Sequence, residues 1–360
     1  MTKKQNRPYL MKLLSLALVL LFVFSLAACS NGNGGQPAEN QGDNQSAENG
    51  QQEPDEGQEE AERPVVRVAT LKGPTGMAMA KMMEDDSQGA GKNDYEFTVL
   101  GAPTDAAAMI TSGQADIAGV PVNMAANLYQ KTKGKIKLIN INTLGVLYVL
   151  ERGGETIKSV ADLKGKTVYS TGQGSTPEYV FNYILQQNGL DPEKDLTVEY
   201  KSEHTELAAL LAAGNADVAV LPQPFVTSVL LQNQDVHVVL DLTAEWEKVA
   251  GSDKPLAMGA AIVSSGFLEN NPGAVADFLT ELAASTAFAN ENPEEASTLI
   301  EKYDIMKAAV AKQAIPKCNM VFMSGEEMKA GVESFLQVMY DADPVSVGGK
   351  LPDDGFYYSK

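Results

Sequence analysis

The sequence contains an internal repeat with an offset of 101 residues. Residues 112–121, SGQADIAGVP, return as residues 213–222, AGNADVAVLP, and the register holds well outside this stretch, where Gly73 aligns with Gly174. Self-similarity on this scale predicts two similar lobes in one chain. Because a cleft between two lobes is a common place for a small-molecule site, the repeat also indicates where such a site would lie.

The N-terminus has the features of an export signal. Basic residues precede an apolar run of 16 residues from Leu13 to Ala28. This run is shorter than the roughly 20 residues that a membrane span needs, and it suits a cleaved signal peptide over residues 1–28. The run ends in Leu-Ala-Ala before Cys29, a pattern that resembles a bacterial lipoprotein box and predicts lipidation of Cys29. An ordinary signal peptide followed by an incidental cysteine is the alternative.

Residues 29–63 are rich in Asn, Gly, Gln, Glu, Asp and Pro and contain almost no apolar side chains. Such a stretch cannot bury enough surface to offset its ordering entropy, so we expect a lipidated, disordered tether. The whole chain carries a net charge of −19; without the +4 of the signal region and the −8 of the tether, residues 64–360 carry −15. This balance argues against nucleic acid as a partner, because phosphate binding is driven by Lys and Arg.

Cysteine and histidine are too scarce for several kinds of site. Apart from Cys29 the only cysteine is Cys318, so we expect no disulfide within the folded part despite the predicted export. One thiol and two histidines, His204 and His237, argue against a metal site of the usual kind. We therefore expect neither a metal nor another cofactor, and the folded part is long enough to build a core without such staples.

From Val65 onward, apolar β-branched segments alternate with helical patterns. This order predicts an α/β fold of two lobes, each a mainly parallel sheet flanked by helices. Residues 144–150 and 257–263 lie between the repeated blocks and have extended patterns, so we expect them to be two crossings between the lobes. Lobe one would then comprise residues 64–146 and 257–360, and lobe two residues 147–256.

The candidate ligand-binding residues lie mainly in turns that follow strands. In open α/β sheets, ligands sit outside the carboxyl ends of the strands, where turns lead into helix N-termini, and free N–H groups there suit an acidic or carbonyl group. In lobe one the candidates are Lys72, Gly73, Pro74, Thr75, Gly76, Pro121 and Asn123. In lobe two they are Tyr148, Gly174, Ser175, Thr176, Pro177, His204, Thr205, Gln223 and Phe225.

Each candidate also has a purely structural interpretation. Gly-Ser-Thr-Pro before a helix can be only a cap, Pro121 and Pro222 can serve mainly to start helices, and His204 can be a solvated loop residue. The only arginines of the folded part, Arg67 and Arg152, lie outside these turns. Since a strongly bound dianion usually calls for a bidentate arginine, a neutral or singly charged ligand with an apolar body fits better.

Four segments resemble the solute-binding lipoproteins of ABC transporters, in particular the nitrate/sulfonate/taurine group that also includes binders of thiamine pyrimidine precursors. These segments are Ser112-Gly113 with Asp116-Ile117-Ala118, residues 159–166 (SVADLKGK), Gly174-Ser175-Thr176-Pro177 and Pro222-Gln223-Pro224-Phe225. The resemblance covers nearly everything after Arg63. It implies a type II periplasmic-binding-protein fold, ligand capture by hinge closure and delivery to a membrane permease.

The function implied by the resemblance is that of the extracytoplasmic solute-binding component of an ABC importer. The protein would hold a small organic ligand in the inter-lobe cleft and pass it to the permease subunits. We expect a monomer, anchored by its lipid at the outer face of the bacterial cell membrane. A sensory lipoprotein that presents its ligand to a receptor is one alternative. An enzyme on the same fold is another, although the sequence offers no nucleophile–base pair with supporting spacing.

Overall fold

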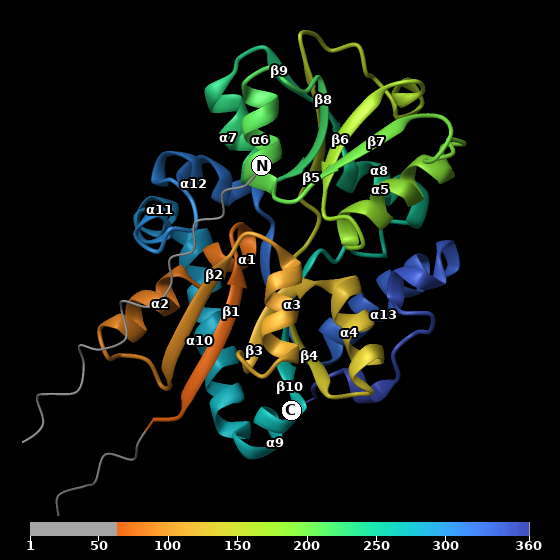
Figure 1. Ribbon diagram of the computed structural model, residues 1–360. Helices are drawn as coiled ribbons and strands as arrows, with labels where there is room; N and C mark the ends of the chain where they lie inside the picture. The colour runs from red at the N-terminus through yellow and green to blue at the C-terminus, as the bar shows by residue number, and fades with distance from the viewer. Residues whose placement is uncertain (1–62, 360) are drawn as a thin grey trace, which may run out of the picture. The chain divides into compact units, whose positions relative to one another are not determined.

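The computed structural model describes residues 63–359. The predicted signal peptide, the predicted lipidation site at Cys29 and the predicted tether up to residue 62 lie outside the described residues. Two sheets with helices packed against them form two lobes, with lobe one in the lower half of Figure 1 and lobe two in the upper half. The two-lobe α/β fold predicted from the sequence is confirmed.

Each lobe is built on one sheet. The strands of lobe one are β1 (Val65–Leu71), β2 (Asp94–Leu100), β3 (Ile117–Pro121), β4 (Ile136–Thr143), β10 (Gly259–Ser264) and β11 (Met320–Met323). Their order is β11-β4-β10-β3-β1-β2. The strands of lobe two are β5 (Leu147–Arg152), β6 (Thr167–Thr171), β7 (Thr197–Lys201), β8 (Val218–Pro222) and β9 (Val236–Asp241). Their order is β7-β6-β8-β5-β9.

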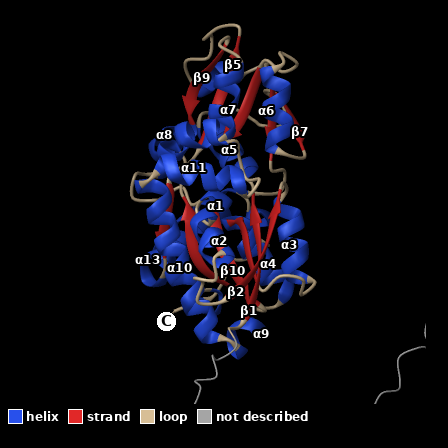
Figure 2. Ribbon diagram, turned by 90° about the vertical axis from the view of Figure 1, so that its left-hand side faces the viewer, coloured by secondary structure: helices blue, strands red, loops and turns tan. Residues whose placement is uncertain are grey.

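Helices connect the strands and lie on both faces of the sheets (Figure 2). Those of the two repeated blocks are α1 (Pro74–Met77), α2 (Ala80–Ser87), α3 (Pro103–Thr111), α4 (Val122–Thr132), α5 (Thr176–Gln187), α6 (His204–Ala212), α7 (Phe225–Gln232) and α8 (Leu242–Ala250). Those of the last third are α9 (Ser265–Asn270), α10 (Pro272–Glu291), α11 (Pro293–Lys302), α12 (Ala308–Ala314) and α13 (Gly325–Ala342). Short 3₁₀ turns occupy Val160–Leu163, Ile315–Lys317, Pro344–Val347 and Asp354–Phe356.

The sequence repeat corresponds to a structural equivalence between the lobes. In lobe one β1 lies between β2 and β3 and is parallel to both. In lobe two β6 lies between β7 and β8 and is again parallel to both. Strands β3 and β8 begin 101 residues apart, as do helices α3 and α6. The repeat therefore places matching turns at matching ends of the two sheets.

The sheets are mixed, whereas the sequence predicted mainly parallel ones. Strand β10 is antiparallel to β3 and β4, and β5 is antiparallel to β8 and β9. The physical reason lies in the connections between the lobes. Both β5 and β10 start at the end of their own sheet that faces the other lobe. Leu147 pairs with Pro222 at the end of β8, and Gly259 pairs with Pro121 at the end of β3. A chain that enters a sheet at the carboxyl ends of its parallel strands must run against them.

In each sheet, an acidic residue of the repeated motif joins two strands at the end that is remote from the other lobe. Asp116, just before β3, accepts hydrogen bonds from the backbone N–H (3.0 Å) and Nε (2.9 Å) of Arg67 on β1. Asp217, just before β8, forms an ion pair with Arg152 on β5. Both pairs lie at the strand ends that are remote from the other lobe. This part of the motif thus fixes strands rather than a ligand.

The last third of the chain contacts both lobes. Strand β11 pairs with β4 in lobe one, and α12 packs against α7 of lobe two. The ring of Phe335 on α13 lies 5.5 Å from that of Trp246 on α8, and both side chains are fully buried in one cluster that extends through both lobes. Helix α13 therefore ties the lobes together on one side of the molecule.

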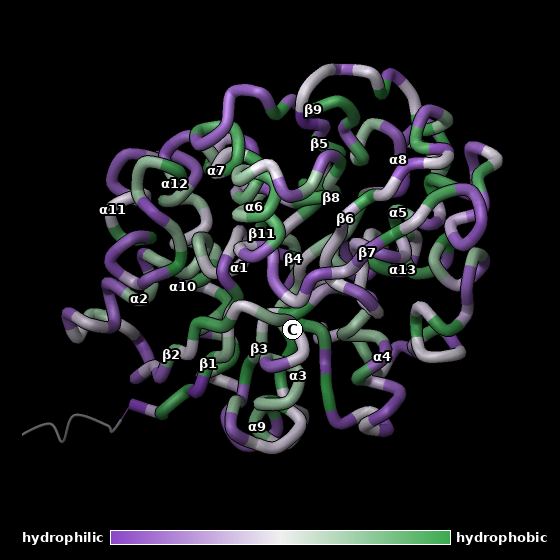
Figure 3. Tube along the Cα trace, turned by 45° about the horizontal axis from the view of Figure 1, so that its top comes forward, coloured by the Kyte–Doolittle hydropathy of each residue, from purple (hydrophilic) through white to green (hydrophobic). Residues whose placement is uncertain are grey.

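The interior of the described part is apolar, and its outer loops are polar (Figure 3). Buried side chains from both sheets and from the helices around them form three apolar clusters. Among residues 63–359, no helix combines the length and the apolarity that a membrane crossing requires.

Replacing Phe335 by Ala should lower the free energy of unfolding by about 3–5 kcal/mol, because it removes a fully buried aromatic side chain and leaves a cavity between the lobes. Urea denaturation followed by circular dichroism measures this change. Val345, whose side chain is 68% exposed, is the control position. A Phe335→Ala loss no larger than that of Val345→Ala would contradict the assigned packing between α13 and α8.

Candidate functional site

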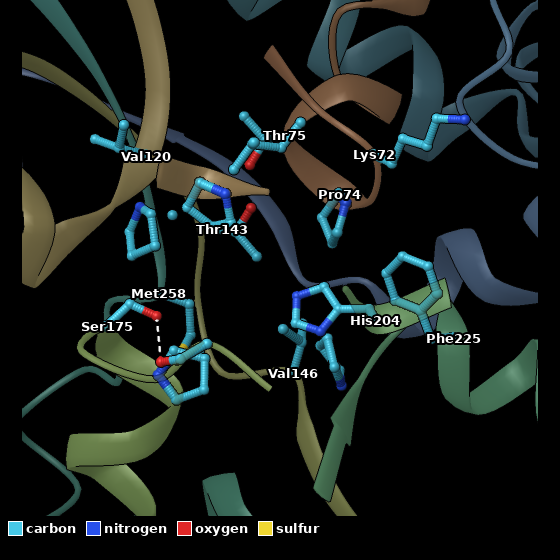
Figure 4. A pocket seen from close by; sticks show the side chains of 17 residues that line it. Lys72, Pro74, Thr75, Val120, Thr143, Val146, Ser175, His204, Phe225 and Met258 are labelled. Atoms are coloured by element: carbon cyan, nitrogen blue, oxygen red, sulfur yellow. Dashed lines mark hydrogen bonds between the residues drawn. The ribbon is translucent and has the colours of Figure 1, made fainter. Parts of the chain in front are cut away.

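A pocket lies between the two lobes, with walls from both (Figure 4). Its cavity volume is about 90 Å³. A single water molecule needs roughly 10–15 Å³ of cavity volume measured in the same way. The space therefore suits a small organic molecule. The lining residues are Leu71, Lys72, Pro74, Thr75, Pro103, Val120, Pro121, Thr143, Val146, Gly172, Ser175, Pro177, His204, Pro222, Phe225, Met258 and Gly259.

The pocket is where the parallel strands of both sheets end and their helices begin. In lobe one, β1 leads into α1 and β3 leads into α4; in lobe two, β6 leads into α5 and β8 into α7. Gly73 (φ 120°) and Gly174 (φ 73°), the two glycines aligned by the repeat, both adopt positive φ values. Glycine takes such angles at little cost, so the repeat marks the two sharp turns from strand to helix.

Eight of the sixteen candidate residues line the pocket. In lobe one they are Lys72, Pro74, Thr75 and Pro121, and in lobe two they are Ser175, Pro177, His204 and Phe225. Pro121 and Pro222, which the repeat aligns, both lie in the wall. The structure thus brings residues from matching turns of the two lobes to one place.

The other eight candidates lie outside the lining. Gly73, Gly76 and Gly174 shape the turns; a Cβ atom at Gly76 would lie only 2.4 Å from the carbonyl oxygen of Leu71. Gln223 accepts hydrogen bonds from the backbone and hydroxyl of Thr227. Thr205 is exposed and bonds to Glu203, and Tyr148 packs against the core of lobe two.

Asn123 and Thr176, the remaining two candidates, join the lobes beside the pocket. The Thr176 hydroxyl donates to Asn123 Oδ1 at 3.0 Å, and both side chains are fully buried. Asn123 is held in turn by its Nδ2, which donates to the Ser346 carbonyl at 3.0 Å. This contact is a polar link between α4 and α5 that exists only while the lobes are close together.

Sequence reasoning missed eight of the lining residues: Leu71, Pro103, Val120, Thr143, Val146, Gly172, Met258 and Gly259. Four of these lie within or directly beside the two crossings between the lobes: Thr143, Val146, Met258 and Gly259. The crossings were predicted, and a crossing chain has to pass the carboxyl ends of the strands in both sheets. That constraint would have pointed to these positions.

Asn142 lies behind the lobe-one wall and organises two of its hydroxyl groups. The hydroxyls of Thr75 (3.3 Å) and Thr143 (2.9 Å) both donate to Asn142 Oδ1. A Cβ atom at Gly259 would lie 2.6 Å from this oxygen, so glycine there leaves room for the amide. Asn142 is fully buried, and its Nδ2 has no hydrogen-bond partner among residues 63–359. A buried amide N–H group without a partner lowers the folding stability by about 1–3 kcal/mol. Such unpaired groups are more typical of functional sites than of protein cores.

His204 forms the opposite wall with Phe225. Their ring centroids are 5.0 Å apart, and His204 Nδ1 lies 2.6 Å from the hydroxyl of Thr171 at the end of β6. Burial lowers the pKa of His204 from 6.5 to about 4, because removal from water disfavours the imidazolium. The imidazole is therefore neutral at physiological pH.

Comparison with known proteins assigns the chain to a family. The model of the NMT1/THI5-like family matches residues 94–296. This match covers more than half of the chain, and the chain belongs to that family. No curated protein matches the sequence.

Solved structures share the fold over most of the chain. An ABC transporter protein from Parabacteroides distasonis is 28% identical, with a TM-score of 0.66 over 82% of this chain and 99% of that one. The periplasmic aliphatic sulphonate-binding protein SsuA of Escherichia coli is 18% identical, with a TM-score of 0.64 over 82% and 92%. The alkanesulfonate-binding protein SsuA of Xanthomonas axonopodis pv. citri, solved with bound MOPS, is 16% identical, with a TM-score of 0.64 over 81% and 96%.

The fold, the pocket between two lobes and the family together define the class of protein. The chain has the fold of the periplasmic binding proteins, it belongs to the NMT1/THI5-like family, and it shares its fold with an ABC transporter protein at 28% identity. The family match and the ABC transporter structure confirm the group that the sequence predicted, namely the nitrate/sulfonate/taurine and pyrimidine-precursor group.

The stability of the protein should fall as the pH is lowered from 6.5 to 4. In this window the unfolded chain protonates His204 while the folded protein keeps it neutral, so the difference reaches up to about 3 kcal/mol near pH 4. Urea denaturation at several pH values measures it. His204→Gln should flatten this part of the profile, and the same change at His237, whose side chain is 40% exposed, serves as the control. Equal profiles for wild type and His204→Gln would contradict a neutral imidazole in the folded protein.

Proposed function

We propose that the protein binds one small organic solute in the pocket between its lobes and delivers it to the permease of an ABC importer. The observation that carries this proposal is the pocket wall itself, to which helix N-termini and strand ends of both lobes contribute. A ligand that contacts both lobes binds the closed form better than the open form, and this differential affinity shifts the population toward closure.

The contact between Asn123 and Thr176 supports closure as the event that the permease detects. The two side chains can bond only when α4 and α5 are in contact. Ligand and contact therefore favour the same arrangement of the lobes. We propose that surfaces of both lobes at the edge of the cleft meet the permease in this arrangement only.

The finer parts of the proposal follow from the sequence. We propose a monomer anchored through Cys29 at the extracytoplasmic face of a bacterial membrane. We also propose a binding protein rather than an enzyme, because the polar groups that line the pocket include no nucleophile with an adjacent base. A sensory role would use the same pocket. Deletion of the permease gene separates the transport role from the sensory role, since it abolishes uptake of the solute but not a sensory response.

Thermal-shift screening should identify the solute, because a ligand that binds only the folded form raises the melting temperature. The panel contains sulfonates, nitrate, aromatic acids and pyrimidines, and uptake by cells with and without the permease follows for each hit. A ligand that raises the melting temperature but is chemically converted during incubation would contradict the proposed function.

Replacing Thr75 or Thr176 by Val should weaken binding of that ligand while leaving the protein folded. Thr75 lines the pocket, and Thr176 holds the lobes together through Asn123. Each lost hydrogen bond is worth about 0.5–1.5 kcal/mol, so calorimetry should show affinities about 3- to 10-fold lower. Thr75→Ser and Thr176→Ser keep the hydroxyl and are the matched controls. Unchanged affinity in both Val variants would refute this location of the site.

A further inference from the structure

The side chains that line the pocket offer few hydrogen-bond donors to a ligand. Five of the lining residues have polar side chains: Lys72, Thr75, Thr143, Ser175 and His204. The Lys72 side chain points away from the other labelled lining residues (Figure 4), and its ammonium forms an ion pair with Asp304 at 3.1 Å. The neutral His204 imidazole carries a single N–H, and its Nδ1 already contacts the Thr171 hydroxyl. The hydroxyl protons of Thr75, Thr143 and Ser175 are the decisive feature, because a hydroxyl that already donates its proton presents only lone pairs to a ligand.

All three hydroxyl protons of the lining are committed within the protein. Thr75 and Thr143 donate to Asn142 Oδ1, and Ser175 donates to the Gly172 carbonyl at 2.6 Å. Figure 4 draws this last bond as a dashed line. All three hydroxyls therefore face a ligand as acceptors. The Asn142 amide determines this polarity for the lobe-one wall, and Asn142 is a positioning residue rather than a contact.

The backbone of the wall is depleted of donors as well. Five of its residues are prolines, which have no backbone N–H. These are Pro74, Pro103, Pro121, Pro177 and Pro222. Pro74 and Pro103 are the first residues of α1 and α3, and Pro177 is the second residue of α5. The first N–H groups of a helix are the ones that usually hold anions. The sequence predicted that such N–H groups would suit an acidic or carbonyl group; the prolines remove several of them.

The pocket is also unsuited to a cation. None of its described lining residues is Asp or Glu, and the imidazole of His204 is neutral. A buried charge without a partner is costly. The wall that faces a ligand combines apolar rings and methyl groups with three hydroxyl acceptors and the neutral imidazole of His204.

We propose that the pocket selects an uncharged solute whose polar groups are N–H or O–H donors, such as a carboxamide or an amino-substituted ring, and disfavours sulfonates and other oxyanions. This inference rests on the proposed function and names the substrate class of the same site. It separates the protein from the sulphonate-binding SsuA proteins that share its fold.

Calorimetric titration of the full chain with matched pairs of compounds tests the proposal. Benzamide and benzenesulfonate share one apolar body, butyramide and butanesulfonate share another, and benzylamine adds a cation. The amides should bind at least about tenfold tighter than the sulfonates. Tighter binding of a sulfonate, or of benzylamine over benzamide, would overturn the inference while leaving a solute-binding pocket. Binding of none of the five at millimolar concentration would count against the inference; with a silent thermal-shift panel it would count against the proposed function as well.

Substitution of Asn142 tests the positioning role. Asn142→Leu removes the acceptor of both hydroxyl protons, so Thr75 and Thr143 become donors toward the pocket. The ratio of benzamide to benzenesulfonate affinity should then fall by about tenfold or more. If this variant does not fold, Thr143→Val provides the second test, since loss of one acceptor should weaken benzamide more than benzenesulfonate. An unchanged ratio in every folded variant would show that Asn142 has only a structural role.

Discussion

The site depends on one geometric constraint, namely that the carboxyl ends of the parallel strands in both sheets face the same space. Helices α1 and α4 start there in lobe one, and α5, α6 and α7 start there in lobe two. The crossings β5 and β10 run antiparallel to their neighbours because they also begin at this place. Once two such sheets face each other, a pocket lined by turns from both lobes follows.

The sequence predicted the two lobes and the matching turns because both are local features that a repeat preserves. Gly73 and Gly174 share a positive φ, and Pro121 and Pro222 both reach the wall. The aligned threonines diverge. Thr75 belongs to a helix of four residues, whereas Thr176 begins one of twelve and bonds to Asn123 in the other lobe. Equivalent register fixes the position of a turn, but the packing of each helix decides where its side chains lie.

Other parts of the site could not be predicted because they depend on long-range contacts. The direction of the Thr75 hydroxyl is set by Asn142, which is 67 positions away in the chain. The pKa of His204 depends on burial between the lobes, which no local pattern shows. The chemistry offered to a ligand thus emerges only when β4, β10 and the turn after β1 come together, and it differs from what helix N-termini alone would suggest.

The central claim is that one solute holds the two lobes together around the pocket. Small-angle X-ray scattering of the protein with and without the ligand found by thermal shift tests it most directly. Because the ligand and the bond between Asn123 and Thr176 favour the same closed arrangement, the radius of gyration should decrease on ligand addition, and Thr176→Val should require more ligand for the same change. Saturating binding with an unchanged radius of gyration would contradict the account.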